Sequence, residues 1–325
     1  MKRLSKSNII IIVVCCIVAF LTLAVCEYYF GHNPSNWNKI STNVFEIPDL
    51  KQGFIPQGLC FDEMQEKYFV SGYMKDGSPS RIYVIDNQTN QKKYFTLSSQ
   101  DFESGHFGGI STHGDFVFVA SDKHVLTLSA NDIANVKNGE KVQVQNSLLT
   151  PTGADFCFAQ NDGLWVGEFY RAKKYETDPT HYVKISEKEI NHSVAIFYPY
   201  DNLAQSELSA VATKALSIPD QVQGMSILPD GRIVLSSSWS LADSKIYIFG
   251  TERAQENTTL ALGETQVPME VLSKQDIQKT IVAPCMAEGI VCKDNNLQIL
   301  FESACNKYKF FTRNRIRHVQ SVKID

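Results

Sequence analysis

The sequence predicts an all-β protein, a β-propeller of five blades that follows one N-terminal apolar helix. Groups of short apolar strands, separated by turn residues, recur at intervals of roughly 45 to 70 residues, which is typical of propeller blades. Most groups open on a similar glycine-containing stretch, which a β-sandwich would not need. With 43% hydrophobic and 20% charged residues, the composition is that of an ordinary globular chain.

The first segment is predicted to anchor the chain in a membrane. Lys2, Arg3 and Lys6 precede the apolar run 9–25, which spans roughly 25 Å as a helix, near the lower limit for crossing a bilayer. Positive charge before the run favours a cytoplasmic N-terminus and a cell-membrane protein whose remaining chain is extracytoplasmic. The predicted parts are a basic cytoplasmic tail (1–8), a transmembrane signal anchor (9–26), a tether (27–43) and the propeller domain (44–325).

Two other interpretations of the N-terminus stay open. Ala24 and Cys26 are small enough for the cleavage site of a signal peptide. The stretch from Leu23 to Cys26 also resembles a lipoprotein box, although Val25 stands where a smaller residue is usual. All three interpretations export the domain.

Each predicted blade begins with three strands. In chain order these are 55–62, 67–73 and 80–86; 106–111, 116–121 and 124–129; 153–158, 164–169 and 194–198; 223–227, 232–239 and 245–249; and 288–292, 297–302 and 308–311. Candidate fourth strands are 92–97, 142–148, 208–216 and 267–272, while 44–47 and 318–324 are expected to close the ring from the two ends. Six blades are the alternative, because the two longest intervals could hide a degenerate blade.

The last group contains a predicted hairpin with a cysteine at each end. Cys285 and Cys305 lie at equal sequence distance from Asn295, which stands in a turn-forming cluster. An antiparallel pair folded about that turn would bring the two thiols together, and export would permit their oxidation. We therefore expect a disulfide between Cys285 and Cys305.

The chain resembles the propellers of the SMP-30/gluconolactonase, paraoxonase and strictosidine-synthase-like group. The resemblance rests on the openings Pro56-Gln57-Gly58-Leu59 and Ala287-Glu288-Gly289-Ile290 and on the strands that follow them. Those families have six blades. The resemblance implies a Ca²⁺ ligand role for Glu288, whereas the asparagine and aspartate ligands of those enzymes have no clear match here.

Polar residues at the start of the inner strands are expected to line one mouth of the central channel. The residue before the repeated glycine points toward that mouth, and oxygen ligands of this kind suit Ca²⁺. Glu288 and Asp155 are the candidate metal ligands, and His106 is the candidate catalytic base. Water and neighbouring blades could equally satisfy these polar groups. The mouth residues are Gln57, His106, Asp155, Gln223 and Glu288.

A second set of candidates stands at the ends of the second strands. Glu168 and Glu302, together with Glu288, could form paired carboxylates for general acid–base catalysis. The long polar segment 170–193 is a natural place for ligand or partner contacts. The strand-end residues are Tyr73, Ser121, Glu168, Trp239 and Glu302.

Three functions agree with these patterns, and the sequence does not decide whether the protein is an enzyme. The first is a membrane-anchored binding module with a small-molecule or protein ligand at the channel mouth. The second is a Ca²⁺-dependent lactone or ester hydrolase that uses Glu288 and His106, and the third is a structural envelope protein. A net charge of −4 argues against nucleic-acid binding, and the sequence contains no G-x-S-x-G, P-loop or H-E-x-x-H motif.

Overall fold

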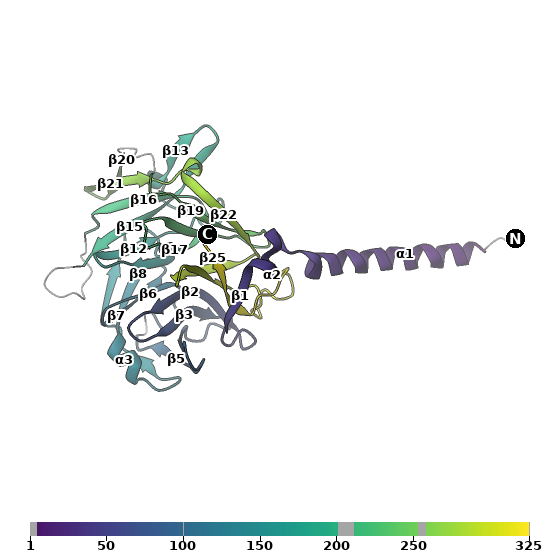
Figure 1. Ribbon diagram of the computed structural model, residues 1–325, viewed down its shortest axis with the longest axis horizontal. Helices are drawn as coiled ribbons and strands as arrows, with labels where there is room; N and C mark the ends of the chain where they lie inside the picture. Colours follow the sequence, from purple (N-terminus) through teal and green to yellow (C-terminus); the bar gives the residue numbers. More distant parts are fainter. Residues whose placement is uncertain (1–4, 100, 201–210, 253–257, 325) are drawn as a thin grey trace.

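The computed structural model describes residues 5–99, 101–200, 211–252 and 258–324. Five sheets stand around a common axis, and a single long helix projects away from them (Figure 1). This arrangement confirms the five-bladed propeller with one N-terminal apolar helix.

The first three blades follow one another in the chain. The first contains β2 (Phe54–Asp62), β3 (Lys67–Met74), β4 (Arg81–Asp86), β5 (Lys92–Leu97) and β9 (Lys141–Val142). The second contains β6 (Phe107–His113), β7 (Phe116–Ser121), β8 (His124–Ser129) and β10 (Asn146–Leu149), with the short helix α3 (Ala130–Asn135) after β8. The third contains β11 (Phe156–Ala159), β12 (Gly163–Gly167), β15 (Ser193–Pro199), β16 (Lys214–Ile218), β21 (Thr265–Val271) and β20 (Thr258–Leu262).

The last two blades complete the ring. The fourth contains β17 (Val222–Ile227), β18 (Ile233–Ser237), β19 (Ser244–Phe249) and β22 (Ile277–Ala283). The fifth contains β23 (Ala287–Lys293), β24 (Asn296–Phe301), β25 (His318–Lys323) and β1 (Ser41–Glu46), so the two ends of the domain share one sheet. A two-stranded sheet, β13 (Val183–Ser186) with β14 (Glu189–Asn191), stands in the insertion of the third blade.

Apolar side chains fill each gap between neighbouring blades. Five separate hydrophobic clusters each draw residues from two adjacent sheets, and the first joins β1 and β24 of the fifth blade to β2 and β3 of the first. Strands such as β7, with sequence Phe-Val-Phe-Val-Ala-Ser, are apolar on both faces because each face packs against another blade. One blade alone would expose both faces, so burial in the ring holds the sheets together.

The recurrent glycines permit the inner strands to approach one another closely. A Cβ atom on Gly109 would lie 2.4 Å from the backbone nitrogen of Cys157, and one on Gly289 would lie 2.4 Å from that of Leu59. Both distances are shorter than real contacts allow. Gly109 instead donates a backbone hydrogen bond of 2.9 Å to Asp155 of the next blade. The glycine-led openings of the sequence therefore mark ring closure.

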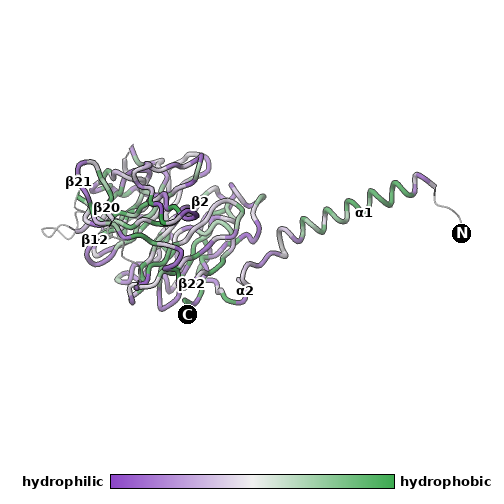
Figure 2. Tube along the Cα trace, turned by 90° about the horizontal axis from the view of Figure 1, so that it is seen from above, coloured by the Kyte–Doolittle hydropathy of each residue, from purple (hydrophilic) through white to green (hydrophobic). Residues whose placement is uncertain are grey.

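Helix α1 (Lys6–Cys26) stands clear of the propeller and is apolar along most of its length (Figure 2). None of its residues is buried, and at 1.5 Å per residue it is about 31 Å long, close to the thickness of a bilayer core. Ser5 caps its first turn by accepting a hydrogen bond of 3.2 Å from the Asn8 amide. A π-helical turn (Glu27–Gly31), a 3₁₀ turn (Pro34–Asn36) and the short α2 (Trp37–Ile40) lead to β1.

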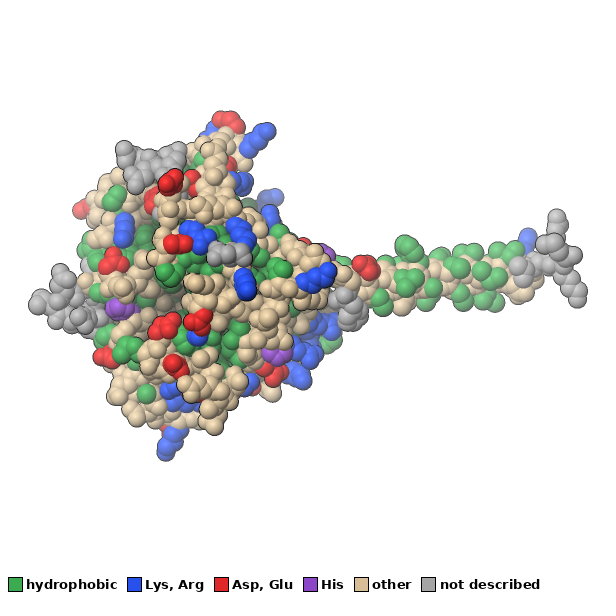
Figure 3. Space-filling view, in the orientation of Figure 1, with side chains coloured by type: hydrophobic (Ala, Val, Ile, Leu, Met, Phe, Trp, Pro, Cys, Tyr) green, Lys and Arg blue, Asp and Glu red, His purple; other side chains and the backbone are tan. Residues whose placement is uncertain are grey.

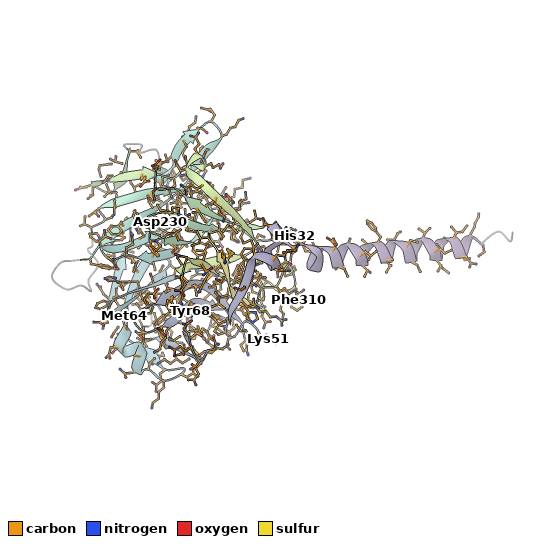
Figure 4. All side chains as sticks on the ribbon, viewed as in Figure 1. His32, Lys51, Met64, Tyr68, Asp230 and Phe310 are labelled. Carbon is orange, nitrogen blue, oxygen red and sulfur yellow. The ribbon has the colours of Figure 1, made fainter. Side chains whose placement is uncertain are left out.

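The root of α1 is held on one face of the propeller, which we call the anchor face. This face carries the ends of the second strands and the starts of the inner strands. His32 contacts Asp243 at 2.7 Å, Arg313 lies 5.3 Å above the Tyr28 ring, and Asn314 donates a hydrogen bond to the carbonyl of His32. In Figure 4 His32, Lys51 and Phe310 lie on the side from which α1 leaves, whereas Met64 and Asp230 lie on the opposite side.

The outer strands differ in part from those predicted. The strand 92–97 and the closure of the ring by both chain ends are confirmed. Residues 141–142 instead join the first blade in parallel with β5, and β10 completes the second blade. Residues 267–271 belong to β21, which runs parallel to β16 in the third blade, while β22 completes the fourth. The candidate 208–216 lies partly outside the described residues, and its described end joins β16.

The predicted third strand 308–311 is wrong, because these residues lie in a loop between β24 and β25. The chain turns immediately after β24, where the amide of Cys305 donates to the carbonyl of Glu302 at 3.0 Å and that of Tyr308 donates to Cys305 at 3.1 Å. The third strand of the fifth blade is β25.

The predicted disulfide is also wrong, because Cys285 and Cys305 are separate, buried thiols. A bulge between Ala287 and Ile290 shifts the register of β23 against β24, so that Ala287 faces Phe301. Extended outward, this register would place Cys285 opposite residue 303, and the turn then leads Cys305 away. The Cys285 thiol instead donates to the carbonyl of Arg313 at 3.5 Å.

Candidate functional site

A pair of buried glutamates stands at the channel mouth on the anchor face. Glu288 is the second residue of the inner strand β23, and Glu302 directly follows β24. The two residues are 2% and 9% exposed, and their carboxyl groups form a hydrogen bond. The backbone sets this approach, since the amide of Glu302 donates to the carbonyl of Met286 at 3.1 Å.

Burial raises the pKa of both carboxyl groups. Burial is the main cause for each, and the neighbouring charge of Glu302 raises the pKa of Glu288 further. The positive charge of Lys307 and the hydrogen bonds from Gln57 and Glu288 offset part of the increase for Glu302. The hydrogen bond between the two carboxyl groups requires a proton on at least one of them, and the raised pKa values favour that protonated form.

Two glutamines from other inner strands flank this pair. Nε2 of Gln57 donates to Glu302 at 3.1 Å and to the carbonyl of Pro56 at 2.8 Å. Nε2 of Gln223 lies 3.5 Å from Glu288, at the long limit of a hydrogen bond. Both glutamines keep part of their surface exposed. Gln57, Glu302, Glu288 and Gln223 therefore form one polar chain across the mouth.

A cationic and aromatic wall continues this chain. Nζ of Lys307 donates to the Tyr73 hydroxyl at 2.6 Å, and Tyr308 also bonds to that hydroxyl. The His106 ring lies on the Tyr73 ring with centroids 4.4 Å apart. His106 keeps an exposed surface at the mouth. The protein around its ring nevertheless displaces water, and this loss of hydration, together with the nearby charge of Lys307, lowers the pKa of His106. A neutral imidazole is therefore expected near pH 7.

Asp155 and Glu168 have local hydrogen-bonding partners of their own in the third blade. Burial raises the pKa of Asp155 to about 7, although its carboxylate accepts a hydrogen bond of 2.7 Å from the Phe169 amide. Glu168 accepts from the Val194 amide at 3.0 Å and contacts Nδ1 of His181 at 2.8 Å. Glu168 thus ties the inserted segment to the blade, and its carboxylate pairs with His181 rather than with another glutamate.

Trp239 belongs to a second aromatic group on the anchor face. Its ring lies 5.9 Å from Phe169 and 6.0 Å from Tyr175, and Nζ of Lys174 lies 4.9 Å above it. This group connects the loop after β18 with the insertion after β12. It forms a surface of its own, apart from the glutamate pair.

The mouth does not have the geometry of a calcium cage. Among the described residues, no group of three or more His, Cys, Asp or Glu side chains has an arrangement that could hold a metal ion. The glutamines face the carboxyl groups with amide nitrogen, which cannot bind a cation. Glu288 and Glu302 also meet each other directly. The arrangement therefore favours two carboxyl groups that hydrogen-bond to each other.

Sequence reasoning missed Lys307 and Tyr308. Both were placed in or beside a predicted strand, whereas the turn after β24 folds them back toward the mouth. A basic residue five positions after a strand-end glutamate was the available clue, but its meaning depends on how the chain turns.

The comparisons with known proteins concern the fold alone. No family model and no curated protein matches the sequence. A PQQ-bound aldose sugar dehydrogenase of Streptomyces coelicolor aligns over 87% of this chain and 97% of its own, with 10% identity and a TM-score of 0.49. A putative oxidoreductase (glucose dehydrogenase) of Thermus thermophilus aligns over 87% and 99%, with 9% identity and a TM-score of 0.44.

Proposed function

We propose that this protein is a membrane-anchored extracytoplasmic binding module whose channel mouth holds a small, neutral, hydroxyl-rich ligand. The observation that carries the proposal is the hydrogen-bonded pair of Glu288 and Glu302 with an amide on each side. The apolar length of α1 and the basic residues Lys2, Arg3 and Lys6 before it support the anchor and its orientation.

The pair favours a neutral ligand because its own charge is suppressed. The raised pKa values favour protonated carboxyl groups, and a protonated carboxyl group offers both an O–H donor and a carbonyl acceptor. The glutamine amides add further donors and acceptors, and Lys307 is already hydrogen-bonded to Tyr73. A hydroxyl group can donate and accept at once, so it matches this mixed set better than a cation or an anion does.

The aromatic wall adds an apolar contact beside the polar chain. Tyr73 and His106 lie face to face at a tilt of 35° and stand at the same mouth. Aromatic faces pack well against C–H groups, whereas carboxyl and amide groups bind hydroxyls. Carbohydrates present both kinds of surface, and we take a neutral saccharide as the working ligand class.

Acid–base catalysis at the same mouth is the second candidate. Raised pKa values are typical of catalytic carboxyl groups, and the lowered pKa of His106 suits a general base. Glycosidases hold their two carboxyl groups about 5 Å or more apart to admit the reacting atoms. Here the carboxyl groups touch, so binding is the better-supported function.

Calorimetry with the full chain in nanodiscs tests the proposal. The probes are glucose, N-acetylglucosamine and lactose, and the variants are Glu288→Ala and Glu302→Gln. We expect saturable heat with at least one probe and an affinity at least about tenfold lower in Glu288→Ala, the loss of one or more buried hydrogen bonds. The matched control Glu187→Gln alters an exposed carboxylate in the insertion and should bind like the parent.

Two outcomes would overturn this assignment. Absence of binding heat with all three probes would contradict a saccharide as the ligand. Saturable binding of calcium chloride that disappears in Glu288→Ala would instead support the metal-dependent hydrolase, and lactones and esters would then be the substrates to examine.

A further inference from the structure

The loop between β24 and β25 combines exposed aromatic side chains with a concentration of positive charge. Residues 306–317 read Asn-Lys-Tyr-Lys-Phe-Phe-Thr-Arg-Asn-Arg-Ile-Arg and include no carboxylate, although the whole chain has a net charge of −4. Phe310 and Phe311 are 66% and 65% exposed. We call residues 306–317 the basic loop.

A cationic cleft adjoins this loop. Its volume is about 510 Å³, and Lys51, Lys75 and Lys309 line it beside Phe310. Among the described residues of its lining, Asp76 is the one acidic side chain, and its carboxylate accepts hydrogen bonds from Ser78. The cleft therefore offers several ammonium groups to an anion of the size of a phosphate ester.

The basic loop lies beside the root of α1. Arg313 and Asn314 of the loop contact Tyr28 and His32, which follow α1. Figure 3 shows Lys and Arg side chains gathered around this root, and Figure 4 places Lys51 and Phe310 on the same side. The surface of a bilayer that α1 crosses therefore faces the basic loop.

We propose that the basic loop docks on that bilayer, with Phe310 and Phe311 in the headgroup region and the lysine cleft on the phosphate of an anionic phospholipid. The proposal rests on the membrane anchor in the function proposed above. Aromatic residues favour the interface between water and lipid, and basic residues are attracted to an anionic lipid surface. Charge and position both favour lipid over a protein partner.

Docking would also orient the channel. Tyr73 and Lys307 connect the basic loop to the glutamate pair, so the mouth would open toward the membrane surface. A ligand would then reach Glu288 and Glu302 from the space next to the bilayer rather than from bulk solution.

A tryptophan placed at the tip of the loop reports docking directly. The full chain carrying F311W is reconstituted in nanodiscs of phosphatidylcholine alone or with about a third of phosphatidylglycerol, both containing lipid brominated near the headgroup. The signal of the parent, which has its own tryptophans, is subtracted. We expect bromine to quench the introduced tryptophan at least about twofold more with phosphatidylglycerol, because the lysine cleft adds an electrostatic attraction.

The matched control is M64W, since Met64 is 80% exposed on the opposite side of the propeller (Figure 4). Its emission should be unaffected by brominated lipid. Replacing the three cleft lysines in the F311W background (K51E, K75E and K309E) should abolish the extra quenching, with circular dichroism to confirm folding. Equal quenching of M64W and F311W, or none of F311W in nanodisc-bound protein, would overturn docking.

The same preparation separates docking from anchoring. Protein that elutes with the nanodiscs but shows no quenching of F311W retains the anchor and lacks docking. Protein that elutes free of the nanodiscs contradicts the anchor itself, and with it both proposals.

Discussion

A glutamate that meets a second glutamate in a buried site differs chemically from one in water. Both carboxyl groups lose hydration, which raises the pKa of each, and the neighbouring charge of Glu302 raises the pKa of Glu288 further. Lys307 and Gln57 limit the effect on Glu302. The pair is thus a donor and acceptor of hydrogen bonds with little net charge.

We expect Glu302 to make the protein less stable as the pH rises. Its pKa is about 8 in the folded protein against 4.5 as the ordinary value, so between these limits the unfolded chain releases a proton that the folded chain keeps. The free energy of unfolding therefore falls across this window, by a few kcal/mol at about 1.4 kcal/mol for each pKa unit. Thermal unfolding from about pH 5 to about pH 8 measures the change.

The variant Glu302→Gln should flatten this dependence, because the amide does not titrate. Glu288, whose pKa burial also raises, and Asp155, whose pKa is raised to about 7, contribute in the same direction, so some slope should persist. Glu187→Gln serves as the exposed control and should retain the parental profile. An identical slope in Glu302→Gln and the parent would contradict the raised pKa.

Cys285 and Cys305 should react as two thiols. Both are buried, and burial raises the pKa of each to about 11, so neither is a reactive thiolate in the folded state. Alkylation in denaturant without a reductant, followed by peptide mass spectrometry, should label both residues. Labelling that requires prior reduction would show that the two cysteines form a disulfide.

At the scale of the element, the inner strands define the ring. Four of the five inner strands carry a bulge where they begin, at Gln57, Gly108, Gln223 and Glu288 or beside them. At Gln57, Gln223 and Glu288 the bulge turns a polar residue into the mouth, while the next glycine lies against the neighbouring strand. One local feature therefore serves both packing and the site.

Two glycine substitutions should differ in cost for this reason. In Gly109→Ala the new Cβ would lie 2.4 Å from a backbone nitrogen, whereas in Gly224→Ala the nearest atom is 3.1 Å away. We expect a loss of about 3 kcal/mol or more for the first and about 1 kcal/mol for the second, as for overpacked cores. Denaturant unfolding of both variants measures the difference, and equal losses would contradict close approach of the inner strands.

At the scale of the whole molecule, the position of α1 gives the propeller an orientation. The helix leaves from the face that carries the channel mouth, the basic loop and the aromatic group around Trp239 (Figure 1). A membrane-spanning α1 would place all three next to the lipid. The opposite face, with Met64 and Asp230, would point away from it.

Retention of the complete N-terminus should accompany membrane association. We expect the chain to resist extraction by alkaline carbonate, because about 31 Å of apolar helix stays in the bilayer core. Intact mass should include residues 1–26. A mature chain that begins after Ala24 or Cys26 would indicate a cleaved signal peptide, and a lipid adduct on Cys26 would indicate a lipoprotein.

Much of the fold could be predicted because its pattern is local. Alternating apolar and turn residues predict most inner, second and third strands, and five glycine-led groups predict five blades. The outer strands were harder because edge strands are short and half exposed. Residues 141–142 pair in parallel with β5 of the first blade, and residues 265–271 pair in parallel with β16 of the third. The order of the strands in the sequence does not indicate either pairing.

The candidate site was predictable only in its outline. The strand positions predict Gln57, Gln223 and Glu288 at one mouth and Glu302 at the end of a second strand, and the structure joins these four residues in one hydrogen-bonded chain. Lys307, which adjusts the pKa of Glu302, and the pairing of Glu168 with His181 depend on turns and on an insertion. Such contacts follow from chain direction, which residue spacing does not specify.

The sequence alone determined the apolar helix, the all-β class and the five-fold repetition, because periodic hydrophobicity and turn residues act over a few neighbouring positions. Only the tertiary structure decided that Cys285 and Cys305 stay apart, that the two glutamates hydrogen-bond to each other, and that the mouth and the basic loop occupy the anchor face. Each of these depends on a one-residue bulge or a single turn, whose effect is to redirect side chains that lie far apart in the chain.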